Sequence, residues 1–393
     1  MKSVGDGGSP GHWTAPPKEA ALTLARGGPF FSLLKVTGLI HGDGLDVARP
    51  ALALLAFTWL PLLLLAAISR DAGRLVADFA VHARLLIAIP LLLKADGLLH
   101  VLCSGAIERF SRARMEEGSE PRMLEALVRR TERLWNSAGG ELLFLLIGLL
   151  FGQLTLWKAA PIPIRLPETV HYPISAAALW YCVIGLPVFN FLLLRSLWRW
   201  MVWSQLLWRF SRLEMRLIPT NPDLCCGLEP LTIPCHGFAV ILLAAGASIA
   251  GTWASQIVFL GTALTSFDRS LASLVVLALV FGLGPLAAFS GKLYRAKIKG
   301  RAQYGALART YTTQFHERWI VERKSAGLLG SPDIQSLADL ANSYAIVLRT
   351  RLTPFGWREV GIIASAILAP MIPLVLTVVS LREVASKLVG AFF

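Results

Sequence analysis

The chain has 393 residues, of which 55% are hydrophobic and 16% are charged, and its mean hydropathy is +0.58. Soluble domains carry about 25% charged residues, so this composition excludes an ordinary soluble protein and indicates a membrane protein. The formal net charge is +13, and the basic residues sit in short segments between apolar runs. That pattern is typical of membrane topology, and we expect no nucleic-acid partner.

Residues 1–48 precede the first apolar run and form the predicted N-terminal segment. Its first 28 residues are polar and rich in Gly and Pro, and they lack the apolar core of a signal peptide. Apolar residues then recur between Phe30 and Ile40. They predict a short helix that lies flat on the membrane.

Seven apolar runs approach the length of about 20 residues that a membrane-spanning helix needs. The predicted spans are residues 50–69, 85–107, 142–157, 174–194, 237–267, 271–291 and 361–380. The third run is short unless residues 138–141 join it. The fifth is longer than a core of ~30 Å requires, so we expect it to tilt, break or protrude. The sequence thus predicts an all-α, polytopic transmembrane bundle, with six spans in residues 49–291 and the seventh in residues 361–393.

Lysine and arginine alternate strongly between the two sides of these spans. One alternate set of segments holds 29 of the 38 basic residues, and the other set holds 8. Because basic loops stay in the cytoplasm, this bias predicts a cytoplasmic N-terminus and a periplasmic or outside C-terminus. We expect a multi-pass protein of a bacterial inner membrane whose first partner is the lipid bilayer.

The basic segments themselves have helical patterns. Residues 108–136 carry a sparse apolar stripe, and Gly118 and Pro121 predict a break within them. The helix of span four is expected to continue through residues 195–217.

Residues 292–360 form a predicted cytoplasmic helical module. Within it, Ser331, Pro332 and Asp333 have the pattern of a helix start. The apolar residues that follow share one helical face, and they are Ile334, Leu337, Leu340, Ala341, Tyr344, Val347 and Leu348. That face must pack against the preceding helix, around residues 304–319, or against another protein. A homo-oligomer and a cytoplasmic protein partner at residues 331–351 are therefore the partner hypotheses.

Several segments carry a family resemblance. They are RLLIAIPLLLKADGLLH in span two, RSLWRWMVWSQLLWRFSRLEMRLIPTNPDLCCGL after span four, and YGALARTYTTQFHERW followed by SPDIQSLADLANSY. Together they resemble a family of uncharacterised bacterial multi-pass inner-membrane proteins over about residues 29–393. The chain departs from the family pattern with Asn221 in place of His and Cys226 in place of Gly. The resemblance implies a fold and a compartment, and it carries over no established activity.

Span two contains Lys94, Asp96 and His100, which are ionisable groups inside an apolar run. Burying such groups in a membrane costs about 2.5–3.5 kcal/mol each, so they indicate a polar pathway or a polar helix contact near a helix end. Asp96 and His100 are one turn apart on one face, whereas Lys94 points about 200° away from Asp96. Glu141, at the start of span three, is a candidate partner.

Tryptophan and arginine alternate after span four, and this pairing is typical of the lipid headgroup region. The candidates for headgroup contact are Arg195, Trp198, Arg199, Trp203 and Arg209. An interfacial belt and a specific anionic-ligand site are the two interpretations.

The cysteines do not form a usual metal motif. Cys225-Cys226 and Cys235-His236 are adjacent pairs, whereas tetrahedral zinc sites use pairs separated by two to four residues. We expect no metal, no cofactor and no catalytic residue.

Three functions remain open from the sequence. The first is an ion or small-solute channel or transporter that uses the polar groups of span two, favoured by prolines and polar residues within the spans. The second is a membrane scaffold or sensor that acts through residues 292–360. The third is a membrane enzyme acting on lipid-linked substrates.

Overall fold

The computed structural model describes residues 27–39, 47–69, 72–116, 121–159, 175–322 and 332–378, which form helices and no strand. Seven helical segments among them are long and apolar enough to cross a membrane. They are Ala48–Ile68, Phe79–Arg112, Arg122–Thr155, Ala176–Phe210, Glu229–Leu260, Leu264–Ala287 and Trp357–Val375. The predicted all-α bundle of seven spans is confirmed. Most of the two predicted terminal segments, residues 1–26 and 379–393, lies outside the described residues.

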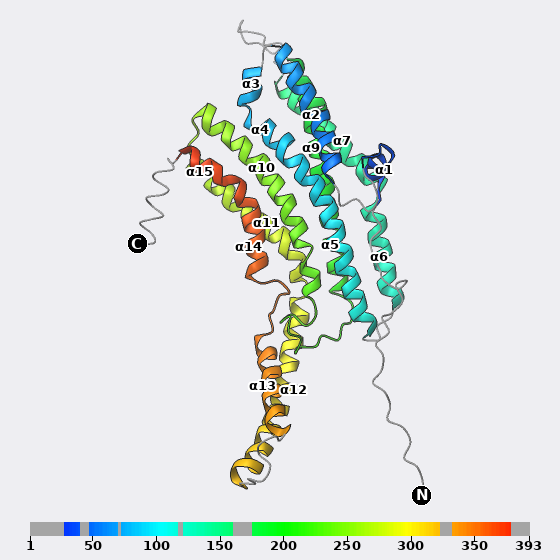
Figure 1. Ribbon diagram of the computed structural model, residues 1–393, viewed down its shortest axis with the longest axis vertical. Helices are drawn as coiled ribbons and strands as arrows, with labels where there is room; N and C mark the ends of the chain where they lie inside the picture. The colour runs from blue at the N-terminus through cyan, green and yellow to red at the C-terminus, as the bar shows by residue number, and fades with distance from the viewer. Residues whose placement is uncertain are drawn as a thin grey trace.

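The helices follow one another up and down the bundle (Figure 1). In chain order they are α1 (Pro29–Val36), α2 (Ala48–Ile68), α3 (Ala72–Ala77), α4 (Phe79–His82), α5 (Ile89–Glu116), α6 (Pro121–Trp135), α7 (Ala138–Ala159), α8 (Ala176–Trp180), α9 (Leu186–Phe210), α10 (Cys235–Leu260), α11 (Asp268–Ala287), α12 (Ser290–His316), α13 (Pro332–Arg349), α14 (Trp357–Leu368) and α15 (Ile372–Val378). Helix α9 is central, since it packs against α5, α6, α7, α10 and α11.

Spans two and four each contain a π-helical turn. In span two the turn η2 (Ala83–Ala88) joins α4 to α5, and in span four η3 (Tyr181–Gly185) joins α8 to α9. Span two begins at Phe79, six residues before its predicted start, because the Asp78 carboxylate accepts hydrogen bonds from the amides of Ala80 and Val81. The first amides of a helix have no acceptor within the helix, and this cap supplies an acceptor for two of them.

The predicted breaks in long helices are confirmed. Helix α5 ends at Glu116 and α6 begins at Pro121. Span five ends at Leu260 because Gly261 takes a left-handed conformation, with φ of 64°. The predicted helix 195–217 is shorter than expected, since α9 ends at Phe210 and residues 214–218 have no regular structure.

Two further predictions about helix ends can be compared with the structure. Span three begins at Ala138, so residues 138–141 do join it. Span seven is divided into α14, a 3-10 turn at Ala369–Met371 and α15, and the turn contains Pro370.

The α12–α13 hairpin extends away from the bundle at one end, called here the hairpin end (Figure 1). Its two helices pack on each other, so α12 covers much of the apolar face that α13 was predicted to have. Val347 is buried and Leu337, Leu340 and Tyr344 are half-buried. The intramolecular alternative therefore explains most of this face.

Small residues allow the closest helix contacts. On α7, a Cβ atom at Gly148 would lie 2.9 Å from the Pro187 carbonyl oxygen, and one at Gly152 would lie 2.1 Å from the Cys182 carbonyl oxygen. On α10, Gly251 faces the Phe79 backbone in the same way. Such glycines let helices in a membrane approach closely where no hydrophobic effect drives their association.

We expect Gly152→Leu to destabilise the bundle by about 2 kcal/mol or more, because the rigid Cys182 backbone cannot move aside for a side chain. Gly284→Leu is the matched control, since open space surrounds Gly284 on the exposed side of α11. Thermal denaturation of both variants in detergent is the measurement. Equal melting temperatures for the two variants would contradict the role of Gly152.

Candidate functional site

Four charged side chains meet inside the bundle. Asp96 comes from α5, Glu141 from the first turn of α7, and Arg195 and Arg199 from successive turns of α9. Asp96 lies 17 residues after the start of a 34-residue helical segment, and Arg195 lies 19 residues after the start of a 35-residue one. The cluster therefore lies about midway along spans two and four.

Arg195 links the two carboxylates. Its Nη1 donates to Asp96 Oδ1 at 2.5 Å, and its Nε donates to Glu141 Oε1 at 2.8 Å. Arg199 Nη1 donates to the same Asp96 oxygen. All four side chains are less than a tenth exposed. We call these four residues the ion cluster.

The N-terminus of α1 closes one side of the ion cluster. The Phe30 amide donates to Glu141 Oε2 at 2.7 Å, and the Phe30 ring lies 5.1 Å from the Arg195 guanidinium. Gly28 has a φ of 103°, and a Cβ there would lie 2.6 Å from Glu141 Oε1, so only glycine fits. The sequence predicted a helix lying flat on the membrane here, and its orientation to the membrane stays a prediction. The structure shows that the first residues of this helix bind a buried carboxylate.

Further donors surround the arginines. The guanidinium of Arg199 lies 5.2 Å from the Trp135 ring, and its Nη2 approaches the Gly27 carbonyl at 3.5 Å. Arg195 Nη2, Trp135 Nε1 and Trp203 Nε1 are buried and have no hydrogen-bond acceptor among the described residues. These three atoms are all donors. Arg195 Nη2 belongs to the cluster and the Trp135 ring lies beside it, so the cluster could bind a further anionic or carbonyl oxygen there.

The three ionisable residues predicted in span two lie in different surroundings, as their positions around the helix require. Asp96 faces the ion cluster, His100 is half-buried one turn further along the same face, and Lys94 is exposed on the outside of the bundle. Glu141 was predicted as a partner of span two. The structure places it beside Asp96, with Arg195 between the two carboxylates.

The predicted headgroup belt is corrected at three positions. Arg195, Arg199 and Trp203 are buried by neighbouring helices and do not face lipid headgroups. Trp198 is half-buried and donates to the Leu134 carbonyl at 3.1 Å, and Arg209 is half-buried near the end of α9. The physical reason is that α5, α6 and α7 all cover this part of α9.

A second polar group within span two was missed because Arg84 stood outside the predicted span. In the structure it lies in η2, and its guanidinium donates to the hydroxyls of Tyr181 at 2.8 Å, Ser248 at 3.0 Å and Thr252 at 3.1 Å. All three partners are neutral hydroxyls, so none of them balances the positive charge of Arg84. Arg84 lies near the start of span two, whereas Asp96 lies about midway along it.

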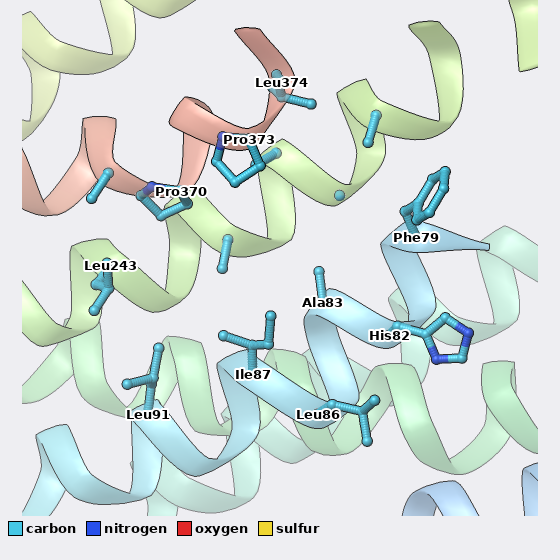
Figure 2. A pocket seen from close by; sticks show the side chains of 15 residues that line it. Phe79, His82, Ala83, Leu86, Ile87, Leu91, Leu243, Pro370, Pro373 and Leu374 are labelled. Atoms are coloured by element: carbon cyan, nitrogen blue, oxygen red, sulfur yellow. The ribbon is translucent and has the colours of Figure 1, made fainter. Parts of the chain in front are cut away.

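An apolar groove of about 540 Å³ lies beside this second site. Figure 2 shows its walls, with Phe79, His82 and Ile87 on span two and Pro370 and Pro373 on span seven. Its lining is almost entirely hydrocarbon, so the groove suits an acyl chain better than an ion.

The cysteines form no metal centre in the described part of the chain, where no three ligand side chains gather. Asp223 instead organises residues 221–229. Its carboxylate accepts from the amides of Cys225 and Gly227 at 2.9 and 2.8 Å, and from the Cys225 thiol at 3.1 Å. Burial raises the pKa of the Cys225 thiol, helped by the Asp223 carboxylate, and burial raises the pKa of Cys226 to about 12.

Comparisons of the chain with protein-family models, curated proteins and solved structures gave no match. The function is therefore argued from the arrangement of the residues alone.

We expect Arg195→Met to destabilise the protein by about 3–5 kcal/mol, because it leaves the Glu141 carboxylate buried without its guanidinium partner. Arg209→Met is the control on the same helix, and its half-buried side chain lies outside the ion cluster. The free energy of unfolding in detergent and dodecyl sulfate is the measurement. A difference below about 1 kcal/mol between the variants would contradict the role of the ion cluster.

We expect Cys225 and Cys226 to react with maleimide at least about a hundredfold more slowly in the folded protein than in the unfolded chain at pH 8. The raised thiol pKa of each keeps the thiolate fraction small at that pH, whereas an unfolded cysteine titrates near 8.5. Mass spectrometry of the alkylated peptides measures both rates. Equal rates would show that the loop does not hold these thiols protonated.

Proposed function

We propose that this integral membrane protein transports a small inorganic anion together with a proton, and that the ion cluster is the coupling site. The observation that carries the proposal is the sharing of partners, since Asp96 binds both arginines and Arg195 binds both carboxylates. Intramembrane ionisable groups of this kind mark ion pathways and proton relays.

The chemistry of the cluster supports coupling. With both carboxylates ionised, the four charges sum to zero. Protonation of Asp96 or Glu141 would leave one positive charge in excess, which a bound anion would neutralise. Arg195 Nη2, which has no acceptor among the described residues, supplies one of the contacts that such an anion needs.

Stability alone gives little reason for such a cluster. Replacing a buried ion pair by well-packed apolar residues is often neutral or stabilising by about 1–4 kcal/mol. A transport site needs charges that can exchange partners, whereas a structural core does not.

Arg84 supports an anion rather than a cation as the cargo. It lies near the start of span two, and its three partners are hydroxyls. Span two therefore carries an arginine near its start, and span four carries Arg195 and Arg199 about midway along it. The π-turns η2 and η3 hold Arg84 and Tyr181, and π-turns occur often at functional sites.

The topology follows from the alternation of basic segments. We infer that the hairpin end faces the cytoplasm of a bacterium, that the chain lies in the inner membrane, and that its C-terminus is outside. A C-terminal alkaline phosphatase fusion tests this orientation, because that enzyme is active only outside the cytoplasm; an inactive fusion beside an active fluorescent-protein fusion would reverse it.

The scaffold hypothesis has less support than transport. Its sequence argument was the apolar face of α13, and α12 covers most of that face. Ile334, Ala341 and Leu348 stay exposed, Ile334 at 46% and Leu348 at 43%. A partner at residues 331–351, or a second copy of the chain, stays a prediction.

Flux into liposomes tests the proposed function. We expect purified protein to take up chloride or inorganic phosphate several-fold faster when the outside is acidified. Asp96→Asn should transport without this acid stimulation, because its side chain can no longer gain a proton. Lys94→Gln, two residues away on the exposed side of α5, should keep the stimulation.

Two results would overturn the proposal. One is the absence of acid-stimulated flux of either anion in the unaltered protein. The other is an unchanged pH profile in Asp96→Asn. Where Asp96→Asn does not fold, Glu141→Gln provides the same test from the second carboxylate of the cluster.

A further inference from the structure

A second concentration of charge lies at the hairpin end, apart from the ion cluster. Two segments about 80 residues apart in the chain form it, namely residues 212–217 after α9 and the first turns of α12. They enclose a groove of about 570 Å³. We call it the basic groove, and its charged lining residues are Arg212, Glu214, Arg216, Lys292, Arg295 and Lys299.

Hydrogen bonds hold the two walls of the basic groove together. The Lys292 ammonium donates to the Leu213 carbonyl, which joins α12 to the other wall. Further along α12, Lys297 donates to the Thr350 carbonyl at 2.7 Å, and Thr350 in turn donates to the Pro219 carbonyl at 3.2 Å. These bonds hold the segment after α9 against the base of the hairpin, so the basic side chains keep their relative positions.

Both walls of the groove carry cations and apolar side chains. Arg212, Arg216, Arg295 and Lys299 are exposed, whereas Leu213 is buried and Met215, Leu217 and Ala296 are half-buried. An occupant would therefore meet both cations and hydrocarbon. A phosphate with an attached glycerol or acyl portion has both kinds of surface.

The position of the groove points to a membrane lipid. Span six ends at Ala287 and span four at Phe210, and the groove begins within five residues of each end. The exposed ring of Trp208 stacks on the Arg212 guanidinium at 3.6 Å, and Tyr294 is exposed on α12. Aromatic and basic residues at span ends occupy the headgroup region.

We propose that the basic groove binds the phosphate headgroup of an anionic phospholipid in the leaflet at the hairpin end. The sequence placed headgroup contacts at Arg195, Arg199 and Trp203, which the structure buries. The groove lies further along the same chain segment, where Arg212 and Arg216 follow the end of α9 and are exposed. Its exposed cations and apolar side chains supply the contacts that a glycerophosphate headgroup needs.

Native mass spectrometry of the full chain in detergent tests this proposal. The protein is titrated separately with phosphatidylglycerol, which is anionic, and with phosphatidylcholine, which is zwitterionic. We expect retention of the anionic lipid at concentrations at which the zwitterionic lipid is lost. The triple variant Arg212→Gln, Arg216→Gln, Arg295→Gln should weaken its binding on the order of a hundredfold, since each charge near an anionic surface contributes about fivefold.

A matched control separates the groove from general surface charge. The triple variant Arg301→Gln, Arg309→Gln, Arg349→Gln removes the same charge from exposed positions of the hairpin outside the groove. We expect it to bind phosphatidylglycerol as the unaltered protein does. Equal loss of phosphatidylglycerol binding in both triple variants would overturn the proposal, because it would show attraction to the general surface charge.

Soluble competitors separate a lipid from a free phosphate compound. Inorganic phosphate or glycerol 3-phosphate in millimolar excess should not displace phosphatidylglycerol, because neither has an acyl portion to contact the apolar side chains of the groove. Displacement by either would overturn the lipid assignment. Where the triple variant does not fold, Arg295→Gln and Lys299→Gln singly should each weaken lipid binding about fivefold, and no change in either would refute the site.

Discussion

Helix α9 carries two arginines into the interior of the bundle, and charge balance there constrains the helices around it. An unpaired guanidinium in hydrocarbon is too costly to keep. Arg84 meets hydroxyls of neighbouring helices, whereas Arg195 and Arg199 meet carboxylates from other spans. Asp96 on α5 and Glu141 on α7 supply the two charges. The rotation of spans two and three about their own axes is thereby fixed relative to span four, which apolar packing alone would leave loosely defined. Gly28 and Phe30 extend the same constraint to α1.

Much of the fold could be predicted because span length and loop charge are properties of the sequence alone. All seven runs cross the bundle, and Pro121 and the excess length of span five marked real helix ends. The start of span two was misplaced because Arg84 looked like a boundary residue. A cation that is satisfied by hydroxyls of distant helices cannot be told from one in a loop until those helices are placed.

The candidate site was predictable in part, and for a physical reason. Asp96, His100 and Glu141 stand out because an apolar run contains few ionisable groups. Arg195 and Arg199 did not stand out, because arginine beside tryptophan at the end of a span is what a headgroup belt also requires. In a membrane the lipid-facing and protein-facing sides of a helix are both apolar, so periodicity gives no sign of which side is covered. Contact with α5, α6 and α7 decides it here.

The two groups of arginine on either side of Phe210 show how one basic segment can serve two purposes. Arg195 and Arg199 are neutralised by carboxylates and enclosed by helices, so their charge acts only within the bundle. Arg212 and Arg216 follow the end of α9, where the backbone has no regular structure and the side chains are exposed. With Arg295 and Lys299 they outnumber the single carboxylate of Glu214, so their charge acts outward. Basic loops orient membrane proteins by such outward charge, and the bonds of Lys292 and Lys297 to the loop backbone give this one a fixed shape that orientation alone does not require.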